Sequence, residues 1–221
     1  MRKILVATDL HLLPSGETLI GLDPAARLGA VLSDAVAHHP DAERLVLLGD
    51  LTHHGTPEEY GRLTPLLRDL PWPVSFLIGN HDDRRAFKAA VPEAPVDDNG
   101  FVQSIVDFDD LRLVTLDTHD PDARPLHSGR LCAQRLHWLD WALATAGARP
   151  CLVFMHHPPI EVGMTGMDRI ALQDAGTVRQ RLKDAGVRHA FAGHIHRTIT
   201  ATVDDLSVTI FRSPCHQMPM R

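Results

Sequence analysis

The stretch Leu45-Val46-Leu47-Leu48-Gly49-Asp50 is an apolar run followed by a glycine and an aspartate. An apolar run bounded by polar residues is typical of a buried parallel strand, and Gly49-Asp50 lies where such a strand ends. In open α/β sheets, ligands bind beyond the carboxyl ends of the strands. Asp50 is therefore predicted to lie at the functional edge of a sheet.

Four other segments repeat this design, each with an apolar run followed by Asp, Asn or His. They are residues 4–7 before Asp9 and His11, 74–78 before Asn80 and His81, 151–155 before His156, and 190–192 before His194 and His196. Parallel strands bring their carboxyl ends to one edge of a sheet, so we expect a single polar cluster with Asp50 in the middle.

Strand and helix patterns alternate along the chain and then become β-rich. Helices are expected over residues 24–37, 57–69, 83–90, 132–146 and 174–185, and strands over 3–8, 44–48, 73–78, 101–108, 111–117, 150–155, 187–192, 198–203 and 206–211. Residues 161–169, rich in Gly and Met, are expected to form an exposed loop. The pattern predicts a layered α/β sandwich, with residues 1–221 as one domain.

The charge balance bears on the class of partner. The chain has 22 basic and 28 acidic residues, a net charge of -6, and only 5% aromatic residues. These values disfavour an extended nucleic acid groove, which needs basic patches and stacking platforms. Three widely spaced cysteines indicate no disulfide framework. With no visible leader peptide and no apolar stretch of spanning length, we expect a cytoplasmic protein without a membrane partner.

The chemistry of the strand-end residues indicates a metal site. Carboxylate and amide oxygens combined with imidazole nitrogens suit Mn, Fe, Zn or Co better than an all-oxygen magnesium cage. A central Asp50 is predicted to bridge two ions. Two such ions can clamp the attacking and leaving oxygens of a phosphoryl displacement and generate hydroxide near neutral pH. Of the 15 histidines, we expect His38, His39, His119 and His137 at the surface.

Taken together, these blocks resemble the five motifs of the calcineurin-like metallophosphoesterase superfamily. The matching segments are Asp9-x-His11, Gly49-Asp50, Gly79-Asn80-His81-Asp82, His156 and Gly193-His194-Ile195-His196. The resemblance extends from Asp9 to His196. It implies a four-layer αββα sandwich of two mixed sheets flanked by helices.

The resemblance also implies a role for each matching residue. One divalent metal would be held by Asp9, His11, Asp50 and His196, and a second by Asp50, Asn80, His156 and His194. His81 would stabilise the transition state or protonate the leaving oxygen. Asp50 and His81 are thus the expected catalytic residues, and a metal-bound hydroxide the expected nucleophile. Asn80, His81 and His196 are expected to contact the substrate.

Within the superfamily, the chain is most similar to class III cyclic nucleotide phosphodiesterases and their glycerophosphodiesterase relatives. The segments that show this similarity are Thr8–His11, Gly55–Tyr60, Gly79–Asp83, Met155–Pro159, Met167-Asp168 and His216-Gln217. The implied substrate is a small phosphodiester, either a cyclic nucleotide or a glycerophosphodiester. One departure is His53, which stands where many members have Asp or Asn. Relatives often have a further C-terminal segment used in oligomer contacts. The resemblance therefore leaves open whether this chain forms a homo-oligomer.

Several alternatives stay open. The same site could serve a phosphomonoesterase, a nuclease or, with less support because every block is intact, a non-catalytic metal-binding scaffold. Asp82 and Asp83 are candidates for hydrogen bonds behind the ligating histidines, with a helix-start role as the alternative. His157 is expected to turn away from the metals or to bond behind them. Asn99 and His216 are candidates for lining the pocket.

Overall fold

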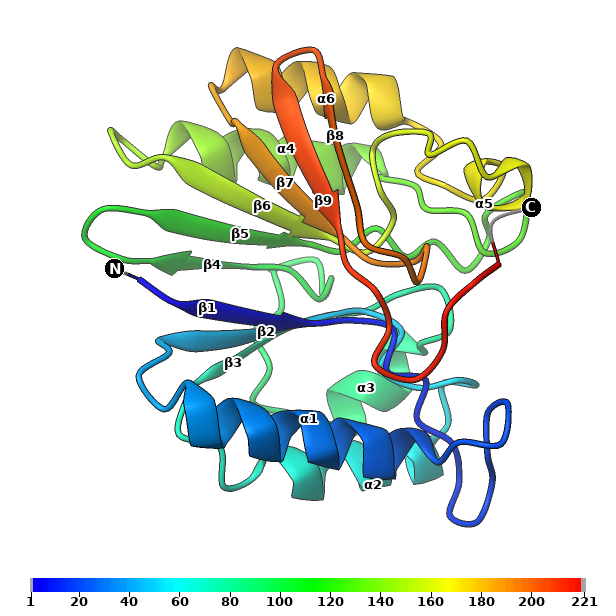
Figure 1. The fold of residues 1–221 in the computed structure, drawn as a ribbon. Helices are drawn as coiled ribbons and strands as arrows, with labels where there is room; N and C mark the ends of the chain where they lie inside the picture. Colours follow the sequence, from blue (N-terminus) through cyan, green and yellow to red (C-terminus); the bar gives the residue numbers. More distant parts are fainter. Residues whose placement is uncertain (1, 220–221) are drawn as a thin grey trace.

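The computed structural model describes residues 2–219 and places two β-sheets face to face between two layers of helices (Figure 1). The helices are α1 (Pro24–His38), α2 (Pro57–Leu67), α3 (Arg84–Ala90), α4 (Ala133–Ala144), α5 (Thr165–Asp168) and α6 (Ala175–Asp184). The strands are β1 (Ile4–Ala7), β2 (Arg44–Leu48), β3 (Val74–Leu77), β4 (Ser104–Asp107), β5 (Arg112–Leu116), β6 (Cys151–Met155), β7 (His189–Ala192), β8 (Ile199–Val203) and β9 (Leu206–Ile210).

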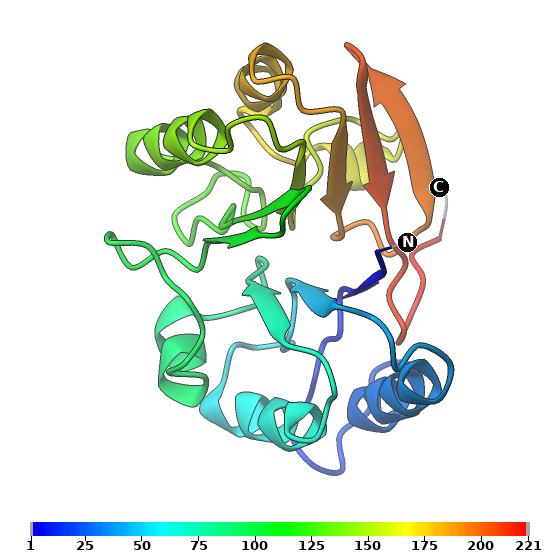
Figure 2. The same cartoon turned by 90° about the vertical axis from the view of Figure 1, so that its left-hand side faces the viewer.

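The smaller sheet has the strand order β1-β2-β3, with parallel pairing throughout. Helices α1, α2 and α3 cover its outer face (Figure 1). The larger sheet has the order β4-β5-β6-β7-β9-β8. Its inner pairs are parallel, and the antiparallel pairs β4-β5 and β8-β9 lie at its two edges. Helices α4 and α6 cover the outer face of this sheet, as the turned view also shows (Figure 2).

Strand β2 shows how the sequence builds these layers. Leu45 and Leu47 pack into the core under α1 and α2, whereas Val46 and Leu48 pack into a second core between the two sheets. Successive side chains of a strand point to opposite faces, so a continuous apolar run fits a sheet that is covered on both sides. The predicted αββα sandwich is therefore confirmed, with antiparallel pairs only in its larger sheet.

Local signals set the helix starts. Asp23 caps α1 by accepting a hydrogen bond from the Ala25 N–H at 2.9 Å, and Pro24 occupies the first turn. Thr56 and Glu59 form a reciprocal capping box on α2. Such caps satisfy N–H groups that have no partner within the helix. These short-range contacts explain why the predicted starts of both helices are confirmed.

The segment 161–169 differs from the expected exposed loop. Residues Thr165–Asp168 form the short helix α5, and Met164 packs into the core between the larger sheet and its helices. The Asp168 carboxylate accepts a hydrogen bond from the Val162 N–H at 2.8 Å. Methionine fills irregular apolar gaps, which is a packing role that composition alone does not reveal. None of the helices within residues 2–219 is long and apolar enough to cross a bilayer.

Candidate metal centre

The site lies at the edge where the carboxyl ends of strands from both sheets meet. Asp9 and His11 follow β1, Asp50 follows β2, Asn80 and His81 follow β3, His156 follows β6, and His194 and His196 follow β7. All of them are buried except Asn80 and His81, which are half-buried. Sequence reasoning placed these residues in one cluster, and the structure brings them together.

The backbone at most of these positions adopts the left-handed conformation. Positive φ values occur at Asp9 (53°), His11 (48°), Asp50 (48°), His194 (70°) and His196 (55°). Residues other than glycine rarely adopt this conformation, which persists where surrounding contacts enforce it and is common at functional sites. At these five positions the turn after the strand therefore directs the side chain into the cluster.

Two glycines allow the ligand side chains to pack directly against backbone. A Cβ atom at Gly79 would lie 2.2 Å from Asp50 Oδ1, and one at Gly193 would lie 2.0 Å from Thr8 Oγ1 and 2.9 Å from Asp9 Oδ2. All three distances are shorter than a Cβ atom can tolerate. Glycine is thus required for close approach, as expected where a functional group packs on the main chain.

A first group of converging donor atoms, which we call the first pocket, comes from Asp9, His11, Asp50 and His196. One potential ligand atom from each lies within 4.8 Å of the others. His196 Nε2 lies 3.0 Å from His11 Nε2 and 3.3 Å from Asp9 Oδ1. His11 Nε2 lies 3.6 Å from Asp50 Oδ2. Two carboxylates and two imidazoles converging on one point form a donor set suited to a divalent transition metal.

A second pocket lies on the other side of Asp50. His156 Nε2 lies 3.3 Å from Asp50 Oδ2 and 3.2 Å from Asn80 Oδ1. The ring nitrogens of His156, His157 and His194 also fall within 4.8 Å of one another. Asp50 Oδ2 therefore faces both pockets.

Two buried histidines present a ring nitrogen to the second pocket. His156 Nδ1 donates to the Leu48 carbonyl oxygen at 2.9 Å, which orients Nε2 towards this pocket. His194 Nε2 is buried and has no hydrogen-bond partner among residues 2–219. An unpaired buried nitrogen is costly unless a ligand satisfies it. These observations fit a metal ion.

The pKa shifts divide the candidate ligand histidines into two pairs. Burial opposes the shift, but the nearby carboxylates raise the pKa of His156 to about 9 and also raise that of His196, so a metal ion would displace a proton from each of these rings. Burial lowers the pKa of both His11 and His194 to about 3, so their rings stay neutral and keep a free lone pair. Burial by itself would raise the pKa of Asp9 and Asp50, but neighbouring histidines outweigh it. Both carboxyls therefore stay ionised. In the part of the chain that the structure describes, their ion-pair contacts are with histidines and not with Lys or Arg.

Asp82 and Asp83 behave differently from each other. The buried Asp82 carboxylate accepts hydrogen bonds from the N–H groups of Leu51 and Gly79, at 3.0 and 2.9 Å, and from the Tyr60 hydroxyl at 2.9 Å. It therefore holds the loops that carry Asp50 and Asn80, rather than bonding to a ligating histidine. Asp83 caps α3 by accepting from the Ala86 N–H at 2.7 Å, the helix-start role that the sequence left open.

The structure places the remaining candidates individually. His157 is buried, with Nδ1 2.8 Å from Thr118 Oγ1 and Nε2 3.1 Å from the His127 carbonyl oxygen, so it bonds behind the second pocket. The ring of His216 lies 4.3 Å from that of His196 and does line the site. Asn99 does not, because it borders a surface hollow beside Trp138.

The expectation for His119 was wrong. Its side chain is only 9% exposed, and burial lowers its pKa to about 4. The loop after β5 turns inward at this point. The Arg84 and Arg135 guanidiniums hold it there, each donating to the His119 carbonyl oxygen at 2.8 Å.

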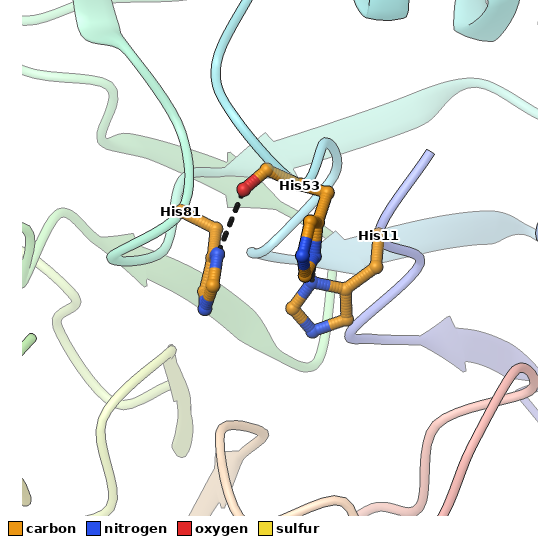
Figure 3. Close-up of side chains that lie close together, drawn as sticks. All are labelled: His11, His53 and His81. Atoms are coloured by element: carbon orange, nitrogen blue, oxygen red, sulfur yellow. Dashed lines mark hydrogen bonds between the residues drawn. The ribbon is translucent and has the colours of Figure 1, made fainter. Parts of the chain in front are cut away.

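Two histidines beside the pockets were not predicted as site residues. His53 Nδ1 lies 3.2 Å from His11 Nδ1, and the His53 carbonyl oxygen accepts from His81 Nδ1 at 2.8 Å (Figure 3). His127 lies 3.2 Å from the Asn80 side-chain amide, measured between Nδ1 and Nδ2. His53 was visible in the sequence only as a departure from the family pattern. His127 lies in a loop without a motif, so no local signal indicated it.

Two adjacent pockets of Asp, Asn and His donors that share one carboxylate define the site as that of a metal-dependent hydrolase. The family model of the calcineurin-like phosphoesterases matches residues 2–198, and the chain belongs to this family.

Several named proteins are similar to this chain. A probable cyclic nucleotide phosphodiesterase of Rhodopseudomonas palustris is 39% identical, over 98% of this chain and 79% of that protein. The glycerophosphodiester phosphodiesterase of Enterobacter lignolyticus is 31% identical, over 95% and 78%. The 3′,5′-cyclic adenosine monophosphate phosphodiesterase of Pseudomonas aeruginosa is 30% identical, over 95% and 75%.

A solved structure supports the fold. The dimetal phosphatase of Danio rerio superposes with a TM-score of 0.79, covering 97% of this chain and 88% of that one. Its sequence identity is 14%, so this likeness concerns the arrangement of strands and helices.

Proposed function

We propose that this chain is a phosphodiesterase that hydrolyses small phosphodiesters with two divalent metal ions, Mn, Fe, Zn or Co. The observation that carries the proposal is the position of Asp50 Oδ2, which lies 3.6 Å from His11 Nε2 and 3.3 Å from His156 Nε2. A single carboxylate oxygen between two sets of nitrogen donors is suited to bridging two cations.

The ligand assignment follows from the two pockets. Asp9, His11, Asp50 and His196 would hold one metal, and Asp50, Asn80, His156 and His194 the other. When bound there, the two ions would neutralise charge on the phosphate and activate water near neutral pH. Asn80, His81 and His196 would contact the substrate phosphate from the rim and floor of the site.

His81 is the proposed acid catalyst. Its Nδ1–H donates to the His53 carbonyl oxygen at 2.8 Å, which fixes the ring orientation (Figure 3). Its main-chain N–H donates to Asp50 Oδ1 at 2.9 Å, which ties its position to the metal centre. In the doubly protonated ring, Nε2–H would donate to the phosphate or to the leaving oxygen.

The substrate class is supported by the relatives. The similar proteins of Rhodopseudomonas palustris and Pseudomonas aeruginosa are named for cyclic nucleotides, and that of Enterobacter lignolyticus for glycerophosphodiesters. A net charge of -6 and a 5% aromatic content fit a small diester better than a long nucleic acid. Hydrolysis of phosphomonoesters and nuclease activity are the alternatives that the experiment below tests.

The deciding experiment is a paired assay on metal-stripped protein reconstituted with Mn, Fe, Co or Zn. It compares bis(p-nitrophenyl) phosphate, p-nitrophenyl phosphate, 2′,3′- and 3′,5′-cyclic AMP and glycerophosphodiesters. We expect metal-dependent turnover that favours diesters and that falls strongly in His81→Ala. Preferred hydrolysis of monoesters would contradict the diesterase assignment, and absence of turnover with two metals bound would contradict catalysis altogether.

We also propose that residues 1–221 act as a single catalytic domain in the cytoplasm. The family model spans residues 2–198, and all three cysteines are free, as suits a reducing compartment. Sedimentation of the purified protein would establish whether it forms a homo-oligomer.

A further inference from the structure

Three imidazole rings form a stack beside the two metal pockets. The ring centroids of His53 and His81 lie 5.0 Å apart at an interplanar angle of 19°, and those of His81 and His127 lie 5.2 Å apart at 17°. Both distances are typical of stacked aromatic pairs. His81 therefore stacks against two rings, one from the loop after β2 and one from the loop after β5.

His127 is bonded to a residue of the second pocket. Its Nδ1 lies 3.2 Å from Asn80 Nδ2, and because an amide nitrogen only donates, His127 Nδ1 must be the acceptor. This bond fixes which way the Asn80 amide points and directs its Oδ1 towards His156 Nε2, 3.2 Å away. The His127 carbonyl oxygen accepts from His157 Nε2 at 3.1 Å, which anchors the loop.

His53 is bonded to a residue of the first pocket. Its Nδ1 lies 3.2 Å from His11 Nδ1, and two ring nitrogens at this distance share one proton (Figure 3). His11 Nε2 faces Asp50 and His196, so the form of His11 that can bind a metal carries its proton on Nδ1. His11 is then the donor and His53 the acceptor, and this bond selects the tautomer of His11.

We infer that His53 and His127 are a pair of positioning residues, each of which orients one metal ligand and stacks against His81. His53 supports the first pocket through His11, and His127 supports the second pocket through Asn80. The inference rests on the proposed two-metal function. It adds separate roles for the two histidines: each supports a metal ligand in a different pocket, and both contact the ring of His81.

The test measures metal binding as well as turnover in the full chain. His53→Ala, His127→Ala and the control His189→Ala, which alters an exposed histidine on β7, are titrated with Mn²⁺ and Co²⁺ by calorimetry and by cobalt absorption. Loss of a partner behind a metal ligand costs about 10- to 100-fold in affinity. We expect such a loss in one of two sites in each alanine variant, a different site in each, and none in the control.

Two further variants separate the two roles of each histidine. His53→Asn and His127→Asn carry a carbonyl oxygen in the place of Nδ1, which can accept from His11 and Asn80, but have no ring to stack on His81. We expect them to recover most of the metal affinity while kcat stays below that of the unaltered chain and KM changes little. Melting curves of the metal-free proteins check that all variants fold.

The possible outcomes are distinguishable. Unchanged metal affinity and turnover in both alanine variants would overturn the inference, as would equal weakening of both sites in each variant. Failure of the two Asn variants to recover affinity would also overturn it. If the unaltered chain binds fewer than two metals or hydrolyses no phosphodiester, the proposed function fails instead, whatever the variants do.

Discussion

Asp50 and Asp117 are both buried aspartates just after the end of a strand, yet their partners differ completely. Asp117 accepts from the Arg84 guanidinium at 2.8 and 3.0 Å and lies 3.6 Å from Arg135. It also accepts from the Val102 and His119 N–H groups, both at 3.0 Å. Asp50 accepts from one main-chain N–H, that of His81, and otherwise faces imidazole nitrogens.

The difference decides what each carboxylate can do. Arginine stays protonated and offers only donors, so Arg84 and Arg135 neutralise the Asp117 carboxylate without an external ion. We call these three residues the closed cluster. Histidine can give up its proton, so the group of carboxylates and imidazoles around Asp50, which we call the open cluster, can offer negative charge and lone pairs to an external cation. A buried carboxylate indicates a metal site when its neighbours are acceptors as well, and a structural ion pair when they are fixed cations.

The largest effect should come from removing the shared carboxylate. Asp50→Ala deletes the oxygen that faces both pockets, so we expect loss of both metals and turnover at background level. Metal content by plasma mass spectrometry and turnover of bis(p-nitrophenyl) phosphate measure the two effects. Two retained metals with undiminished turnover would refute the bridging role.

The matching change in the closed cluster, Asp117→Ala, should lower the free energy of unfolding and leave metal binding unaffected. Asp117→Ala leaves Arg135, which is 4% exposed, without its carboxylate and removes the acceptor of two main-chain N–H groups. Breaking a buried ion pair in this way costs about 3–5 kcal/mol of folding free energy. Urea unfolding of the metal-free protein measures the cost. A normal stability, or a loss of metal ions from the folded variant, would contradict the comparison.

Metal addition should stabilise the chain through the open cluster only. A metal at about 100 times its Kd adds about 2.7 kcal/mol per site to the free energy of unfolding. We expect Mn²⁺ to raise the melting temperature of the unaltered chain and of folded Asp117→Ala, and a chelator to reverse the rise. An equal rise in Asp50→Ala would show that the ions bind elsewhere.

The smallest effect concerns His119, which lies next to the closed cluster. Burial lowers its pKa from 6.5 to about 4, although Asp117 opposes the shift. Between these values the unfolded chain binds more protons, so stability is full above pH 6.5 and falls as the pH drops towards 4. We expect a contribution of about 2 kcal/mol to be lost by pH 5.

Urea unfolding of metal-free protein at pH 7.5 and pH 5 tests this contribution. His119→Gln should lose less stability than the unaltered chain over that interval, because the substituted residue does not titrate. All other titratable groups are shared by the two proteins, so the comparison isolates His119. An identical pH dependence in the two proteins would contradict the assignment.

Much of the site could be predicted from the sequence because its signals are local. An apolar run that ends in a polar residue both forms the strand and places the side chain at its carboxyl end. Glycines mark positions such as Gly79 and Gly193, where ligand and backbone approach closely. The alternation of strands and helices likewise predicted the layers, which the structure and the family match confirm.

Other features depended on contacts between distant parts of the chain. His127 reaches Asn80 across 47 positions, and Asp117 meets Arg84 across 33, so no window of sequence contains either pair. His119 was expected at the surface because nothing in its neighbourhood shows that two arginines hold its loop inward.

The sequence by itself therefore determined the strands and the types of polar residue that follow them, because these depend on short-range periodicity and residue chemistry. Only the tertiary structure decided which histidines face the pockets, which stack on His81 and which carboxylate is neutralised by arginine. Those outcomes depend on burial and on the partners brought close by packing, and both are properties of the folded chain as a whole.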